Sequence, residues 1–194
     1  MKNIKKNLTI KYFLLTILAC ILIFLDQYTK WLATVKLKDK EPFVIIKDVF
    51  EFRYLDGGNT GIAWGLFSGK IPVFIAVTII LIVAIIFFIV RIDRILLSYS
   101  LPGTSATKFK ALQIILAVLL SGAIGNMIDR ITLGYVVDFI YFKLINFPLF
   151  NVADCYVTVT EFILIFSLIF IFSDKETNIL VKKINPKERD ETYE

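Results

Sequence analysis

The sequence of 194 residues contains no histidine. Histidine is the usual general base near neutral pH and the commonest metal ligand, so its absence excludes Ser-His and Cys-His nucleophile arrangements. Cysteine occurs only twice, at Cys20 and Cys155, without metal-ligand spacing or a disulfide pattern, and we expect neither a disulfide nor a metal site. Any chemistry must rest on carboxylates, amides and cations, without a cofactor.

Charged residues are also scarce, at 20% of the chain, whereas hydrophobic residues make up 57%. A soluble domain contains about 45–50% apolar residues even when glycine is included. The net charge of +5 comes from basic residues that flank apolar runs, which membrane topology explains without nucleic acid as a partner. We therefore expect an integral membrane protein with one domain.

Four apolar runs are long enough to cross a bilayer, for which about 20 helical residues are needed. The second run has twenty uncharged residues, the third has eighteen, and the fourth is interrupted only by Glu161. The first has fourteen before Asp26, so a full crossing carries Asp26 inside its final turns. We predict transmembrane helices over about 12–33, 71–90, 110–128 and 155–173.

An even number of spans places both termini on one side. Basic residues beside the first span and between the second and third mark that side as cytoplasmic: Lys2, Lys5, Lys6, Lys11, Arg91, Arg94, Lys108 and Lys110. The charged tail, 174–194, is then expected to be a solvated cytoplasmic end. As an alternative, the amino-terminal run ending ILAC is similar to a secretory signal, but the apolar sequence continues past Cys20, which favours a span.

The outer segment, 34–70, differs from the rest of the chain. FVIIKDVFEFRYL contains β-branched and aromatic residues with partial alternation, and DGGNTG follows with turn residues. We predict a short strand pair, or small β-cradle, at the membrane surface.

Charged and amide side chains near the ends of spans need a reason, because a charge at the centre of a spanning helix costs roughly 2.5–3.5 kcal/mol. Asp26 and Lys30 lie four residues apart and share a helix face, so an interfacial ion pair is one interpretation. Asn126, Asp129 and Arg130 share another face, where Arg130 can fork onto a carboxylate and the cluster can fix packing. Gly122 and the nearby Gly125 permit close approach of another backbone.

Asp138 and Asp154 are two carboxylates in apolar surroundings at one membrane face, separated by a short loop. If they meet, each raises the proton affinity of the other, and the pair can activate water and protonate a leaving nitrogen. Helix capping is the alternative, and Asp154 fits it well. Glu161, two turns beyond Asp154, is expected as a neutral acid hydrogen-bonded inside the bundle.

Five stretches, in order, resemble the bacterial lipoprotein signal peptidase family, signal peptidase II, up to about residue 173: DQYTK at 26–30, NTGIAWG at 59–65, GAIGNMIDR at 122–130, VVDF at 136–139 and FNVAD at 150–154. The resemblance implies an all-α membrane protein with four transmembrane helices and a small extracytoplasmic β-cradle. It also implies hydrolysis of the bond before a diacylglyceryl-modified cysteine at the outer face of the cytoplasmic membrane of a bacterium.

The resemblance also implies a role for each motif residue. The catalytic pair would be Asp138 and Asp154. The substrate-binding residues would be Asn59, Asn126, Arg130 and Asn151. The supporting residues would be Asp26, Lys30, Asp129 and Gly122. The expected partners are diacylglyceryl-prolipoproteins and membrane lipids, and we expect a monomer with residues 1–173 as the peptidase domain.

Two other classes of function remain open at this point. Intramembrane carboxylates also form proton relays in transporters, although the second span offers only Thr78 as a hydroxyl. In a structural or assembly protein, the same Asp and Asn residues would be packing and capping groups.

Overall fold

The computed structural model describes residues 2–61, 70–99 and 101–182, so the second half of the NTGIAWG motif and the end of the tail lie outside the described residues. Four long helices dominate the fold: α1 (Lys2–Leu37), α2 (Ile71–Ser98), α3 (Gly103–Thr132) and α4 (Val152–Phe166). A π-helical turn, Ser167–Ile171, continues α4. Each of the four helices, with α4 counted through Ile171, is long and apolar enough to cross a membrane. This confirms the predicted fold class.

The helices extend beyond the predicted spans at several ends. The prediction ended the second span at residue 90, before Arg91, yet α2 continues to Ser98. A charged residue does not end a helix when its side chain is hydrogen-bonded. Arg91 donates to the carbonyl of Ile179, and Asp93 accepts from Gln113. Helix ends are instead set by backbone chemistry: Pro72 lies in the first turn of α2, and Asn151 caps α4.

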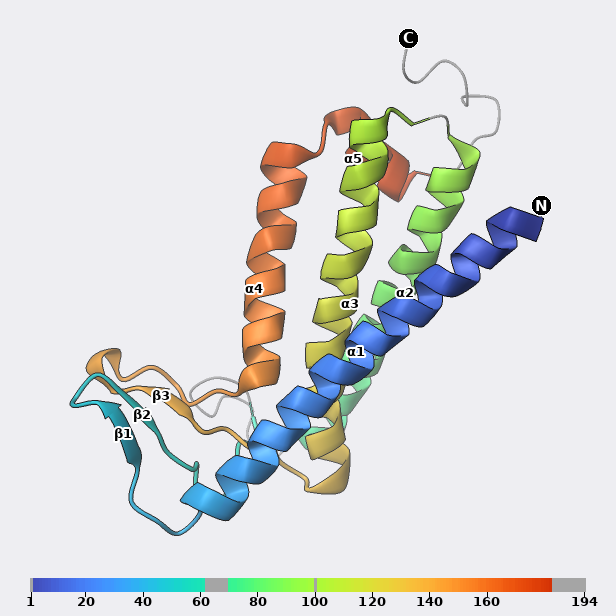
Figure 1. The fold of residues 1–194 in the computed structure, drawn as a ribbon. Helices are drawn as coiled ribbons and strands as arrows, with labels where there is room; N and C mark the ends of the chain where they lie inside the picture. Colours follow the sequence, from blue (N-terminus) through green and yellow to red (C-terminus); the bar gives the residue numbers. More distant parts are fainter. Residues whose placement is uncertain (1, 62–69, 100, 183–194) are drawn as a thin grey trace.

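Helix α3 lies at the centre of the bundle. In its most apolar stretch 56% of the residues are buried, against 6–11% in the other three helices, whose outer faces are available to lipid. α2 and α4 run beside α3, and α1 crosses the bundle obliquely (Figure 1). The apolar core lies in one half of the bundle, between α2, α3 and the chain after α4, and includes Ile89, Ile92, Phe109, Leu112, Phe172 and Leu180.

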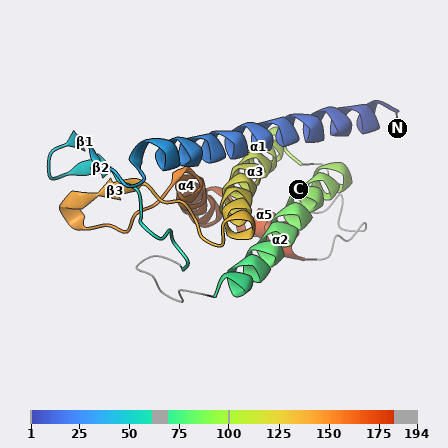
Figure 2. The same cartoon turned by 90° about the horizontal axis from the view of Figure 1, so that it is seen from below.

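A three-stranded antiparallel sheet lies beside the opposite end of the bundle, next to the last turns of α1 (Figures 1 and 2). β1 (Phe43–Ile46) pairs with β2 (Phe50–Phe52), which confirms the predicted strand pair. The prediction missed β3 (Ile140–Phe142), which pairs with β2 from about 90 residues further along the chain. Because β3 follows Asp138 directly, the sheet fixes the segment that carries this carboxylate.

The start of the charged tail is not solvated as expected. Residues 174–181 form α5 (Asp174–Val181), whose Ile179 and Leu180 are buried against the apolar core. The Arg91 guanidinium of α2 donates to the carbonyl oxygens at the end of α5, including that of Ile179 at 2.9 Å. An apolar helix face and a capping cation therefore hold α5 against α2.

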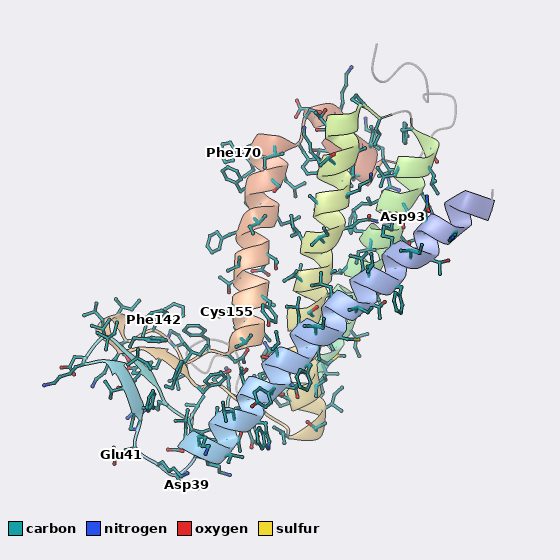
Figure 3. The ribbon with its side chains drawn as sticks, in the orientation of Figure 1. Asp39, Glu41, Asp93, Phe142, Cys155 and Phe170 are labelled. Atoms are coloured by element: carbon teal, nitrogen blue, oxygen red, sulfur yellow. The ribbon has the colours of Figure 1, made fainter. Side chains whose placement is uncertain are left out.

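A polar cluster joins α1, α2 and α3 in the same half of the bundle. Asp93 is buried and accepts from Lys11 and Tyr12 of α1. Gln113 of α3 donates to the same carboxylate at 2.9 Å. Figure 3 shows Asp93 far from Cys155, which lies at the start of α4 beside the sheet. This cluster therefore stabilises the bundle at a distance from the region of the motif residues.

We expect Asp93→Ala to lower the free energy of unfolding by about 2 kcal/mol, because it leaves buried donors without an acceptor. Thermal unfolding in detergent measures the change. Asp56→Ala is the matched control, since Asp56 is an exposed acid of the outer segment and should change stability by less than about 0.5 kcal/mol. Equal melting temperatures for the two variants would show that the cluster does not hold the helices together.

Candidate active site

A buried cation organises the polar end of the bundle. Lys30 of α1 is only 3% exposed, and its Nζ lies 2.9 Å from Asp26 Oδ2 and 3.1 Å from Asp129 Oδ2 of α3. The same Nζ donates to Asn126 Oδ1 at 2.9 Å. The predicted Asp26–Lys30 pair therefore exists, but it is buried and belongs to a network that joins two helices.

The two acids bound by Lys30 each hold a backbone amide beside one of the candidate catalytic residues. Asp26 Oδ1 accepts from the N–H of Ala153 at 2.8 Å, one residue before Asp154. Asp129 Oδ2 accepts from the N–H of Val137 at 3.1 Å, one residue before Asp138. Hydrogen bonds from backbone N–H to a carboxylate are strong, so this network sets where both segments lie.

Gln27 is a member of this network that the sequence analysis did not single out. Its amide Nε2 donates to Asp129 Oδ1 at 2.9 Å and to the carbonyl of Gly125 at 3.1 Å. Gln27 lies inside the DQYTK motif beside Asp26, and this position was the one signal that pointed to it.

Asp154 lies in the first turn of α4, where it forms a capping box with Asn151. Asn151 Oδ1 accepts from the N–H of Asp154, and Asp154 Oδ2 accepts from the N–H of Asn151, both at 3.0 Å. The second oxygen, Asp154 Oδ1, accepts from Asn126 Nδ2 at 2.7 Å. Capping and placement in a polar site therefore coexist, because each uses a different carboxylate oxygen.

Asp138 lies between Val137 and β3 and is 1% exposed. Its Oδ1 accepts from Asn151 Nδ2 at 2.7 Å and its Oδ2 from Asn59 Nδ2 at 2.8 Å. Burial, and then the charge of Asp154, raise the pKa of Asp138 to about 7, although the two amide hydrogen bonds oppose the shift. The loop between Asp138 and Asp154 therefore brings these two carboxylates to the same residue, because Asn151 contacts both.

Asn59 is brought to Asp138 by a short pairing between distant parts of the chain. The N–H of Asn59 donates to the carbonyl of Val136, and the N–H of Val136 donates to the carbonyl of Asn59, both at 2.9 Å. Asn59 Oδ1 accepts from the N–H of Gly61 at 2.9 Å, which orients the amide. The predicted motif at 59–65 thus contributes through its first residues.

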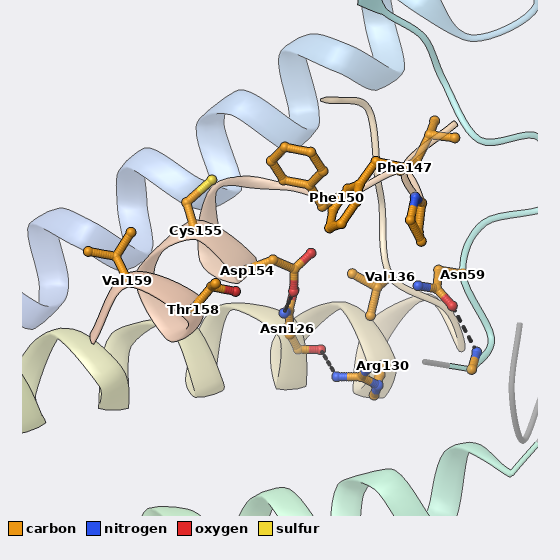
Figure 4. Close-up of a pocket in the computed structure, with 13 residues that line it drawn as sticks. Asn59, Asn126, Arg130, Val136, Phe147, Phe150, Asp154, Cys155, Thr158 and Val159 are labelled. Atoms are coloured by element: carbon orange, nitrogen blue, oxygen red, sulfur yellow. Dashed lines mark hydrogen bonds between the residues drawn. The ribbon is translucent and has the colours of Figure 1, made fainter. Parts of the chain in front are cut away.

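A cavity of about 440 Å³ opens beside these residues (Figure 4). Its polar wall contains Asp154, Asn126, Arg130 and Asn59. Its remaining wall is formed largely by Val136, the loop 147–150, and Cys155, Thr158 and Val159 of α4. Asp138 does not line the cavity directly and contacts its wall through Asn59.

Arg130 does not fork onto a carboxylate as the sequence predicted. Its nearest hydrogen bond is from Nη1 to the carbonyl of Asn126, at 3.5 Å, and its guanidinium carbon lies 5.4 Å from the centre of the Phe74 ring. The reason is that Asp129 and Asp154 already accept from other donors. Among the described residues, Arg130 Nε is the one buried side-chain nitrogen or oxygen without a hydrogen-bond partner.

Gly122 lies where another backbone comes close to α3, and that backbone is the start of α4. A Cβ at this position would lie 2.6 Å from the carbonyl oxygen of Ala153 and 2.8 Å from a methyl group of Val157. At Gly125, a Cβ would lie 2.6 Å from Asp26 Oδ2. Both glycines therefore let the start of α4 approach the Lys30 network.

The expectation for Glu161 is wrong. Its side chain is exposed on the outside of α4 and not hydrogen-bonded inside the bundle. The inner face of α4 meets α3 at Ala153 and Val157. Both cysteines are free, and no group of three or more Cys, Asp or Glu residues in the described part of the chain could hold a metal ion.

Four membrane-length helices, with two carboxylates that both contact Asn151 at one end beside a cavity, point to an intramembrane aspartic peptidase. Comparison with known proteins gives the particular family. The sequence profile of Signal peptidase (SPase) II matches residues 18–170, and the chain belongs to this family. It is therefore a multi-pass protein of a bacterial inner membrane that removes signal peptides from prolipoproteins by an aspartic mechanism.

Relatives support the assignment over nearly the whole chain. The lipoprotein signal peptidase of Caldanaerobacter subterraneus subsp. tengcongensis is 37% identical over 155 residues, which cover 79% of this chain and 94% of the relative. That of Staphylococcus aureus is 32% identical over 170 residues, covering 86% and 95%. A bacterial membrane enzyme solved by the in meso method at 2.3 Å matches with a TM-score of 0.64 and 27% identity, covering 88% of this chain and 94% of that one.

We expect Lys30→Met to lower the free energy of unfolding by about 3–5 kcal/mol, because it leaves Asp26 and Asp129 as buried charges without a cation. Activity should fall with the folded fraction and also per folded molecule, since both held segments lose their support. Thermal unfolding and a cleavage assay on the same detergent sample measure the two effects. Lys38→Met, an exposed lysine beyond the end of α1, should leave both unchanged; a stable Lys30→Met enzyme would contradict the role of the network.

Proposed function

We propose that Asp138 and Asp154 are the catalytic pair of this peptidase and share one proton. The observation that carries the assignment is that both carboxylates contact Asn151 beside the cavity. Asp154 lines that cavity in the first turn of α4, and we assign it as the ionised member of the pair. Asp138, with a pKa of about 7, is the member to which we assign the shared proton.

In the proposed reaction, Asp154 accepts a proton from water as the water oxygen attacks the scissile carbonyl. Asp138 gives its proton to the carbonyl oxygen, which forms a neutral tetrahedral intermediate. Collapse of this intermediate breaks the C–N bond. The leaving nitrogen takes the proton held by Asp154, and Asp138 takes back a proton from one of the two hydroxyl groups on the carbon. The products are a carboxylic acid and an amine, so atoms and charge balance without another reactant.

Asn59 separates Asp138 from the cavity, and this position gives it a role in the proposed reaction. Its Nδ2 now donates to Asp138 Oδ2, and the residue itself lines the cavity. We propose that substrate draws the Asn59 amide onto its own backbone carbonyl and so opens Asp138 to the reacting water. Removal of this donor from the ionised carboxylate also favours the protonated form of Asp138.

Asn126 and Arg130 are proposed to bind the backbone of the substrate. Both line the cavity, and Arg130 Nε is a buried donor without a hydrogen-bond partner among the described residues. An unsatisfied donor in an apolar setting is costly, and a peptide carbonyl would satisfy it. Asn151 has a different role in this proposal, because it is fully buried and its amide already bonds with Asn126, Asp138 and Asp154. We assign it as a positioning residue.

The proposed orientation places the cavity at the outer face of the membrane and both termini in the cytoplasm. The first turns of α1, the connection of α2 to α3, and α5 lie at one end of the bundle, and the basic residues concentrate there (Figure 1). A substrate anchored by a diacylglyceryl group would present its scissile bond at the depth of the cavity. We further propose a monomer, with residues 1–173 as the peptidase domain.

We expect Asp138→Asn and Asp154→Asn each to lower the rate of cleavage about 10³–10⁴-fold, because each removes one member of the acid–base pair. Cleavage of a synthetic diacylglyceryl precursor by purified enzyme measures the rate, and melting in detergent tests folding. Asp56→Asn, an exposed acid of the outer segment, is the matched control and should retain full activity. Inactive variants that also unfold at low temperature would indicate a structural role instead, and an active one would refute the assignment.

The pH profile gives a separate test of the proton on Asp138. Activity should decrease as pH rises through about 7, because ionisation of Asp138 removes the acid. In Asn59→Ala the loss of a hydrogen bond to the ionised carboxylate raises the pKa of Asp138 in the free enzyme, so the alkaline limb of kcat/KM should move to higher pH. Asn178→Ala, in α5, should keep the original profile. An alkaline limb that stays in place in Asn59→Ala would mean that another group carries the proton.

A further inference from the structure

A second cavity, of about 790 Å³, lies between the last turns of α1 and the sheet, apart from the polar site. Its wall is mostly apolar and comes from both elements: Leu32, Ala33, Leu37, Pro42, Phe43, Phe52 and Phe139. Lys36, Lys40 and Glu41 lie at the same cavity, and Figure 3 shows Glu41 in the turn that leads from α1 to β1. We call it the α1–sheet groove. An apolar wall of this size, open at the membrane end of a helix, suits a lipid acyl chain.

Aromatic side chains on α1 indicate the depth of the groove in the membrane. Tyr28 and Trp31 are about half exposed, and their rings pack together with centroids 5.7 Å apart. Exposed Tyr and Trp on a spanning helix are typical of the headgroup level of the bilayer. Lys36 follows Trp31 by five residues, about 7.5 Å along a helix, which places its ammonium at the level of lipid phosphates.

The charges at the groove favour an anion. No carboxylate of the described residues lies within ion-pair distance of Lys36 or Lys40, and Lys40 Nζ donates only to the carbonyl of Val35, at 3.3 Å. Both ammonium groups therefore retain donors for another partner. Two lysines against one glutamate leave a net positive rim around an apolar floor.

We propose that the α1–sheet groove binds one anionic glycerophospholipid, with an acyl chain against the apolar wall and its phosphate between Lys36 and Lys40. The diacylglyceryl group of a substrate fits less well, because it carries no phosphate to match the two lysines. The groove shares Phe139 with the segment that holds Asp138, so the bound lipid would pack against the back of the active site. This site is separate from the proposed catalytic pair and does not depend on it.

The test measures lipid retention and not activity. Native mass spectrometry of the full chain, released from nanodiscs of phosphatidylcholine and phosphatidylglycerol in equal parts, reports which lipid stays bound. We expect the unmodified protein to retain one phosphatidylglycerol. The double variant Lys36→Gln, Lys40→Gln should lose about 25-fold in relative affinity for it, because each lysine at an anionic lipid contributes a factor of about five.

Two matched controls separate the groove from general charge. Lys38→Gln with Lys47→Gln removes the same charge from exposed positions of the same outer segment that do not line the groove, and should retain the lipid. Phe43→Asp should expel it by placing a charge on the apolar wall, whereas Ile45→Asp, on the same strand outside the groove, should not.

Three outcomes would overturn the proposal. One is equal retention of phosphatidylglycerol and phosphatidylcholine by the unmodified protein. Another is equal loss of phosphatidylglycerol from the two double lysine variants, which would indicate nonspecific attraction. The third is that Phe43→Asp leaves phosphatidylglycerol bound but raises KM for a diacylglyceryl precursor, which would assign the groove to the substrate instead.

Discussion

The ammonium group of Lys30, buried between two carboxylates of different helices, is the interaction on which the rest of this site depends. Buried ion pairs often contribute little to stability, because desolvation offsets the attraction. Here the consequence is geometric. Lys30 bridges Asp26 and Asp129, and these two carboxylates accept the backbone N–H groups of Ala153 and Val137. One cation thus sets the positions of two segments that are far apart in the chain.

The bundle divides its polar and apolar interactions between its two ends. Isoleucine and leucine side chains of α2 and α3 pack tightly in the half that carries α5, together with the Asp93 cluster. The other half contains the buried acids and amides, where an apolar core would otherwise form. Gly122 and Gly125 let α4 approach α3 and Asp26 closely enough that this polar half is also well packed. The site is therefore supported by the apolar core in the other half of the bundle and by its own hydrogen bonds.

Asparagine is suited to join two acids because its amide offers both donors and acceptors without adding charge. Asn151 donates to Asp138 and accepts from the N–H of Asp154, while Asn126 donates to Asp154 and accepts from Lys30. A second negative or positive group in these positions would change the proton affinity of the acids directly. The amides hold the acids in place without adding charge. Their hydrogen bonds lower the pKa of Asp138, while burial and the charge of Asp154 raise it.

Much of the architecture was accessible from the sequence, because membrane insertion depends on local hydropathy and the order of motifs is linear. The four helices, the first strand pair and the residues Asp138 and Asp154 all follow from such local patterns. Other features required the tertiary structure: β3, the burial of α5, the exposed Glu161, the lack of a partner for Arg130 Nε among the described residues, and the hydrogen bonds of Gln27 and Asn151 to the acids. Each of these depends on which neighbour has already occupied a given donor, acceptor or face. The carboxylate of Asp129, for example, does not accept from Arg130, because it already accepts from Lys30, Gln27 and the N–H of Val137. Lys30 and Gln27 lie about 100 residues away in the sequence. A sequence pattern states which groups a residue carries, whereas only the folded chain decides which partners satisfy them.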